Sequence, residues 1–212
     1  MSSTSLSAAN AAELLERQDR LQREATRIEA ELDLPRLLGR VGRVVRIGSA
    51  ASGLMVWRDL DVSIYCDGDA PGRNVATALG ELMARPGVRE LDYRDELGPR
   101  SPSGGTHDQR HYATLRYVSA EGETWKVDLS FWTDTGPRGG FSDAAALRRR
   151  LTDETRLAIL WIKDVLHRLD GYLREFAGID VYEAVLDEGV RTPAEFEVYL
   201  TRRLTEDASR SE

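Results

Sequence analysis

The chain has 212 residues, of which 41% are hydrophobic and 31% are charged, and its formal net charge is −7. This length suits one compact domain or a core with a small appendage, and the composition excludes general disorder. The longest apolar runs are far shorter than a membrane span requires, so no membrane association is predicted. The basic residues are scattered, which disfavours binding of nucleic acid over a broad charged surface, although the sequence is compatible with a local basic cleft.

Three further features of the composition bear on location and on candidate residues. The N-terminal stretch has no basic flank followed by an apolar segment, so no export signal is predicted. The single cysteine, Cys66, excludes an internal disulfide, and a cytoplasmic location is favoured. Among 29 lysines and arginines only Lys126 and Lys163 are lysines, which makes both positions candidates for a specific role.

The first half of the chain alternates helical and strand patterns. Residues 8–33 carry an apolar stripe at helical spacing, and residues 43–47 form a short apolar strand pattern. A Gly-Ser turn and a brief helical stretch follow over 48–55. Residues 60–66 alternate as a strand, and 75–84 have a helical pattern that ends at "RPG".

The next segments predict three further strands and a loop. A short strand is expected near 88–93, and 97–106 has the composition of a loop. Residues 111–119 and 124–132 alternate as two strands joined by "AEGE", which predicts a hairpin.

After "TGPRGG" the sequence becomes helical. Apolar residues step by three and four over 158–176, which predicts one helix ended by Gly178. A last helix begins with Thr192 as its cap, Pro193 at the first helical position and Glu195 closing a capping box.

These patterns together predict an α/β (α+β) fold, a mixed sheet flanked by helices. A soft boundary near 137–140 divides the chain into a core with its N-terminal helix (1–140) and a C-terminal helical region (141–212).

Two aspartates occupy one face of a predicted strand. Because side chains alternate along a strand, Asp59 and Asp61 share a polar face, while Leu60, Val62 and Ile64 share an apolar one. Carboxylates about 7 Å apart repel each other, more strongly in a cleft of reduced dielectric. A divalent cation reverses the sign of that effect, and Mg²⁺ prefers one or two carboxylates with waters and phosphate oxygens. A solvated strand face is the alternative reading of Asp-x-Asp alone.

The turn before the aspartates has the properties of a phosphate site. In "GSAASG", Gly48 lets the backbone turn sharply and approach a ligand closely. Ser49 is predicted to cap the short helix and to donate its hydroxyl to a phosphate. An ordinary capped helix start is the alternative. An anion site beside a cation site predicts a pocket for a metal-bound triphosphate.

Gly48-Ser49, then Gly53, then Asp59-Leu60-Asp61 resembles the signature of the DNA polymerase beta-type nucleotidyltransferase superfamily. The likeness is to its small members, the minimal nucleotidyltransferases and the aminoglycoside and lincosamide nucleotidyltransferases. Arg58 departs from the pattern, in which a small polar residue usually precedes the first aspartate.

The resemblance implies a third acidic residue on a later strand. "TWKVDLSFW" supplies Asp128 on the polar face of its strand, where the family pattern would have it complete the metal site and accept the proton of the attacking hydroxyl. Lys126 lies on the same face and is predicted to contact phosphate or to balance the acidic cluster.

The resemblance therefore implies transfer of a nucleoside monophosphate from a nucleoside triphosphate such as ATP to a hydroxyl, with release of pyrophosphate. Asp59, Asp61 and Asp128 are the expected ligands of two Mg²⁺ ions, and Gly48, Ser49 and Lys126 the expected nucleotide-binding residues. The expected acceptor is an aminoglycoside-like small molecule, and a protein partner is the close alternative. Template nucleic acid is disfavoured by charge, and the oligomeric state stays open.

A different class of function also fits the sequence. An antitoxin-like binding module could keep this fold without the chemistry and act through contact with a protein. The complete set of three acidic residues argues against it, because a non-catalytic protein has no need to retain repelling charges.

Overall fold

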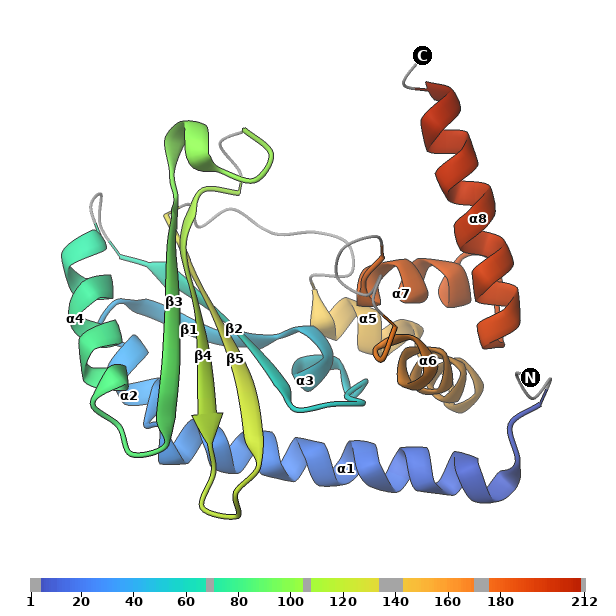
Figure 1. Ribbon diagram of the computed structural model, residues 1–212, viewed down its shortest axis with the longest axis horizontal. Coiled ribbons are helices and arrows are strands. Elements are labelled where there is room, and N and C mark those ends of the chain that lie inside the picture. Colours follow the sequence, from blue (N-terminus) through green and yellow to red (C-terminus); the bar gives the residue numbers. More distant parts are fainter. Residues whose placement is uncertain (1–4, 68–70, 105–107, 134–142, 170–175, 211–212) are drawn as a thin grey trace.

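The structure is a computed structural model that describes residues 5–67, 71–104, 108–133, 143–169 and 176–210. Its centre is one sheet of five strands in the order β1-β2-β5-β4-β3 (Figure 1). β2 and β5 run parallel, and the other neighbouring strands are antiparallel. The strands are β1 (Gly42–Ile47), β2 (Asp59–Cys66), β3 (Val88–Glu96), β4 (Arg110–Val118) and β5 (Thr124–Trp132).

Helices cover the sheet and form a second group beside it. Figure 1 shows α2 and α4 on one side of the sheet and the group α5 to α8 on the other, with α1 running along both. Within the described ranges, no helix combines the length and apolar character needed to cross a bilayer. The helical elements are α1 (Ala8–Glu31), α2 (Leu34–Leu38), α3 (Gly48–Ser52), α4 (Gly72–Met83), the 3₁₀ turn η1 (Gly98–Arg100), α5 (Ala144–Arg150), α6 (Asp153–Leu166), α7 (Gly178–Leu186) and α8 (Pro193–Arg210).

The predicted alternation in the central strands is confirmed. Leu60 and Ile64 of β2, with Val127 and Leu129 of β5, are fully buried against α1, α2 and α4. Burial of such a side chain contributes about 1.5–3 kcal/mol. This apolar face orients the strands, so their polar residues project to the opposite face.

α1 holds the two parts of the molecule together. The hydroxyl oxygen of Ser7 caps it by accepting the N–H of Asn10 at 3.2 Å. Its C-terminal half packs into the sheet core through Ala25 and Ile28. Towards its N-terminal end, Arg17 pairs with Asp164 of α6 at 2.6 Å, so one continuous helix fixes α6 relative to the sheet.

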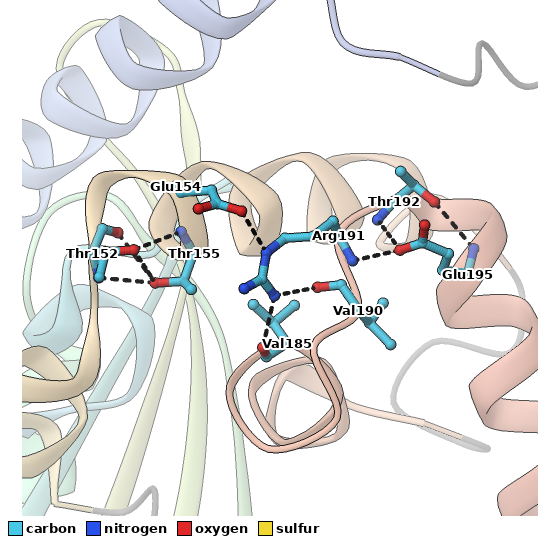
Figure 2. A network of polar contacts seen from close by, with 8 residues as sticks. All are labelled: Thr152, Glu154, Thr155, Val185, Val190, Arg191, Thr192 and Glu195. Carbon is cyan, nitrogen blue, oxygen red and sulfur yellow. Dashed lines mark hydrogen bonds and ion pairs between the residues drawn. The ribbon is translucent and has the colours of Figure 1, made fainter.

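The C-terminal helices have their own core, and a polar network ties their ends (Figure 2). The Arg191 guanidinium donates to Glu154 of α6 at 2.9 Å and to the carbonyls of Val185 and Val190 at 3.0 Å. The predicted capping box of α8 is confirmed: Thr192 accepts the N–H of Glu195, and the Glu195 carboxylate accepts the N–H of Thr192, both at 3.2 Å.

Two predicted helix ends are wrong. The first helix stops at Glu31, because Asp33 adopts a left-handed conformation (φ 55°) and Leu34–Leu38 then forms the separate helix α2. The helix expected over 158–176 ends at Leu166; beyond it Leu169 is 48% exposed, whereas Phe176 still packs into the core of the C-terminal helices.

Other predictions near these ends also change. Gly178 begins α7 instead of ending a helix, and α5 and α7 were not predicted. β3 extends to Glu96, past the expected end at residue 93. The boundary placed near 137–140 lies outside the described residues.

Candidate functional site

The parallel pairing of β2 and β5 brings the three predicted carboxylates together. Asp61 lies opposite Asp128 in the register, and Asp59 lies opposite Lys126. Because in-register residues of neighbouring strands point to the same face, all these side chains leave the sheet on its polar side. One carboxylate oxygen from each of Asp59, Asp61 and Asp128 lies within 4.8 Å of the others. We call these three residues the acidic triad.

Burial makes the charges of Asp59 and Asp61 unfavourable without a counter-ion. Burial, followed by the neighbouring charges of Asp59 and Asp128, raises the pKa of Asp61 to about 7. Burial also raises the pKa of Asp59, against the opposing effect of Lys126. The Oδ1 atom of Asp59 is buried and has no hydrogen-bond partner among the described residues. Such an oxygen, beside two further carboxylates, suits a hard divalent cation.

Lys126 is the cation that faces the triad directly. Its Nζ donates to Asp128 Oδ2 at 2.6 Å and lies 3.5 Å from Asp59 Oδ1. Burial alone would lower the pKa of Lys126, but Asp59 and the hydrogen bond to Asp128 outweigh it and raise that pKa. Thr114 of β4 donates to the other oxygen of Asp128 at 2.9 Å. Both oxygens of Asp128 are therefore held in fixed directions.

The Gly-Ser turn packs directly on the triad. Gly48 has a φ of 62°, and a Cβ at this position would collide with the Asp61 carboxylate, so only glycine fits. The prediction that Ser49 caps the short helix is wrong, because α3 begins at Gly48 and its N-cap is Ile47. Ser49 lies inside α3, where its carbonyl accepts the N–H groups of Gly53 and Leu54. The turn thus brings the backbone at Gly48 against the triad, while Ser49 itself is buried.

Lys163 of α6 was singled out by composition alone, and its surroundings were not predicted. The side chain is only 2% exposed, and its Nζ donates to the Leu54 carbonyl at 2.7 Å and to the Tyr182 hydroxyl at 3.3 Å. Its charge lowers the pKa of both Asp59 and Asp61, against the larger effect of their burial. A buried lysine on the helical side therefore supports the segment that links the Gly-Ser turn to β2 and partly offsets the charge of the triad.

Arg58, which departs from the family pattern, forms its side-chain ion pairs away from the triad carboxylates. Its guanidinium pairs with Glu24 of α1 at 3.0 Å and with Glu123 of the hairpin at 3.1 Å. The arginine at this position therefore acts beside the site, where its side chain joins α1 to the β4–β5 hairpin.

Comparison with known proteins bears on the fold. No family model matches the sequence, and no curated protein sequence matches it. A structure of Cid1, described by its RNA terminal uridylyl transferase activity, matches with a TM-score of 0.53 and 17% identity over 82% of this chain and 52% of Cid1. This likeness confirms the predicted nucleotidyltransferase-type fold.

Two further solved structures are similar at lower scores. A cytoplasmic RNA terminal U-transferase matches at a TM-score of 0.45 with 18% identity, over 72% of this chain and 46% of that protein. The STING-associated CdnE c-di-GMP synthase from Capnocytophaga granulosa matches at 0.49 with 10% identity, over 89% and 67%. The chain spans about half the length of the two uridylyl transferases.

Proposed function

We propose that this protein transfers a nucleoside monophosphate from a nucleoside triphosphate to an acceptor hydroxyl, with release of pyrophosphate. The observation that carries the proposal is the convergence of Asp59, Asp61 and Asp128 on paired strands of a nucleotidyltransferase-type fold. The acceptor oxygen forms a bond to the α-phosphorus, and the bond between the α- and β-phosphates breaks.

The acidic triad is the proposed holder of Mg²⁺. Three carboxylates within 4.8 Å, one with a buried oxygen that accepts no hydrogen bond from the described residues, fit a divalent ion, which would offset their mutual repulsion. Bound Mg²⁺ would neutralise the phosphates and stabilise the attacking and leaving oxygens. Two ions are proposed, in keeping with the resemblance.

The protein's own residues then position the reactants. The proposed role of Gly48 and Ser49 is to let the outgoing phosphates approach the backbone. Gly48 has no side chain, so no Cβ stands between its backbone and Asp61. Asp128 is the proposed acceptor of the hydroxyl proton, with Thr114 fixing its orientation. Lys126, now bonded to Asp128, would move to a phosphate oxygen once the carboxylates bind a cation.

The small-molecule acceptor is part of this proposal, and a protein acceptor is the alternative. Release of pyrophosphate from each of the four nucleoside triphosphates, with Mg²⁺ and pooled hydroxylated acceptors, tests the reaction. We expect Asp128→Asn to abolish release. The matched control is Asp92→Asn, which removes an exposed carboxylate of β3 that is ion-paired with Arg94. Equal release by Asp128→Asn and wild type would contradict the mechanism, and an absence of Mg²⁺-dependent ATP binding would favour the binding-module alternative.

A further inference from the structure

A cavity of about 630 Å³ opens beside the triad, between α1, the β4–β5 hairpin and the end of α6. We call it the basic cavity. Half of its ten lining residues are arginine or lysine, and none is acidic, in a chain whose net charge is −7. The five cations are Arg17, Arg20, Arg58, Arg116 and Lys126.

The basic cavity adjoins the proposed reaction centre through one shared side chain, Lys126. Lys126 lines it and also bonds Asp128 and pairs with Asp59. Arg58 lines it and immediately precedes Asp59 in the chain. A ligand that contacts Lys126 in the cavity is therefore separated from Asp128, the residue proposed to take the proton from the acceptor, by that one side chain.

The arginines of the cavity differ in how firmly they are held. Arg17 and Arg58 are largely covered and are oriented by Asp164 and Glu24. Arg116 pairs with Glu90 at 2.8 Å, but both side chains are about 60% exposed, and such a pair contributes only about 0.2–1 kcal/mol.

Arg20 is similar, with a pair to Glu24 at 4.0 Å and a side chain 51% exposed. Because guanidinium groups bind phosphate through paired hydrogen bonds, Arg20 and Arg116 can exchange these weak partners for phosphate oxygens.

An aromatic group completes the cavity. Trp57 lines it, with its ring centroid 5.9 Å from that of His167. A nucleobase can stack on such a ring. The volume lies within the range of small-molecule sites.

We infer that the basic cavity binds the acceptor, and that this acceptor is a nucleotide: a phosphate for the arginines and a planar base for Trp57. The inference rests on the proposed function and changes its expected acceptor, since a lining with arginines and no carboxylate offers a polycationic aminoglycoside no partner of opposite charge. Transfer to the ribose hydroxyl of the nucleotide gives a phosphodiester and pyrophosphate, and the hydroxyl proton passes to Asp128.

Equilibrium binding tests the inference without relying on turnover. The full chain is first saturated with Mg²⁺ and α,β-methylene-ATP, which occupies the donor site, and is then titrated with AMP, adenosine or kanamycin. We expect AMP to bind at least tenfold more tightly than adenosine, binding to weaken with added salt, and kanamycin not to compete. Equal binding of AMP and adenosine, or competition by kanamycin, would overturn the inference.

A matched pair of arginines supplies the second readout. Arg116→Ala should weaken AMP binding about tenfold, the loss of one charge-assisted hydrogen bond, and leave binding of the methylene-ATP unchanged. The control is Arg94→Ala, since Arg94 is equally exposed and ion-paired on β3 but does not line the cavity. Unchanged AMP binding by Arg116→Ala would contradict the inference.

Two further arms separate related outcomes. If a single-stranded hexaribonucleotide binds more tightly than AMP, the natural acceptor is the end of a strand. If it binds more weakly, the natural acceptor is a free nucleotide. Both results support a nucleotide as the acceptor. If the methylene-ATP itself fails to bind, the proposed function fails, while AMP binding to the protein alone still reports on the cavity.

Discussion

Replacement of Asp61 by asparagine should stabilise the metal-free protein while removing its activity. The pKa of Asp61 is raised from its ordinary value of 3.8 to about 7, chiefly by burial. This difference corresponds to ~4 kcal/mol against the charged carboxylate. An amide of the same shape keeps part of the burial penalty but removes the repulsion from Asp59 and Asp128. We therefore expect about 2 kcal/mol of added stability at pH 8, or roughly 4–8 °C in Tm.

The pH dependence follows with a definite sign. Because the folded protein holds the Asp61 proton more tightly than the unfolded chain, wild-type stability falls as pH rises from about 4 to about 7. The variant should lose the part of this fall that Asp61 causes and keep the smaller part due to Asp59, whose pKa is also raised by burial, so the two unfolding curves should converge near pH 4 and separate above it. Thermal unfolding in EDTA by circular dichroism measures both proteins. A variant less stable than wild type at pH 8 would refute the reasoning that the triad is crowded without a cation.

Two other substitutions test the surroundings of the triad. Gly48→Ala should reduce kcat/KM at least a hundredfold and lower the free energy of unfolding by about 1–3 kcal/mol, because the φ of 62° at Gly48 and the adjacent Asp61 carboxylate exclude a Cβ. The control in the same unfolding and kinetic assays is Gly80→Ala, where a Cβ meets nothing within 4 Å. Lys163→Met should fold but lose about tenfold in kcat/KM for the nucleoside triphosphate, because the Leu54 carbonyl loses its donor; an unchanged kcat/KM would show that the link does not position the turn.

The strands and their polar faces could be predicted from the sequence because they depend on local alternation, whereas the convergence of the triad was implied by the family resemblance. A period of two in residues 60–66 and 124–132 assigns each side chain to a face, and pairing of the two strands then joins the polar faces. The capping box at Thr192 is likewise a local signal.

The features that were missed depend on distant contacts or on single backbone angles. Lys163 acts on Leu54 across 109 positions of the chain, and no periodicity records that contact. The left-handed angle at Asp33 separates α2 from α1 although the apolar stripe continues. Beyond Leu166 the opposite occurs: the spacing continues, but Leu169 is exposed. A periodic pattern thus identifies faces more securely than it identifies ends.

The basic cavity shows why the acceptor class could not be read from composition. An aminoglycoside-like acceptor was expected for this chain, whose net charge is −7. The fold instead gathers Arg17 and Arg20 of α1 with Arg116 of β4 around one cavity, although they are far apart in the chain. Local charge at a site is a property of tertiary structure, and net charge does not determine it.

The most direct test of the central claim is the binding of Mn²⁺, as a spectroscopic substitute for Mg²⁺, followed by electron paramagnetic resonance with α,β-methylene-ATP present. We predict that wild-type protein binds the ion and that Asp59→Asn, Asp61→Asn and Asp128→Asn each lose this binding, whereas Asp92→Asn retains it. Binding unaffected by all three triad substitutions would contradict the claim that these carboxylates are brought together to hold a metal ion.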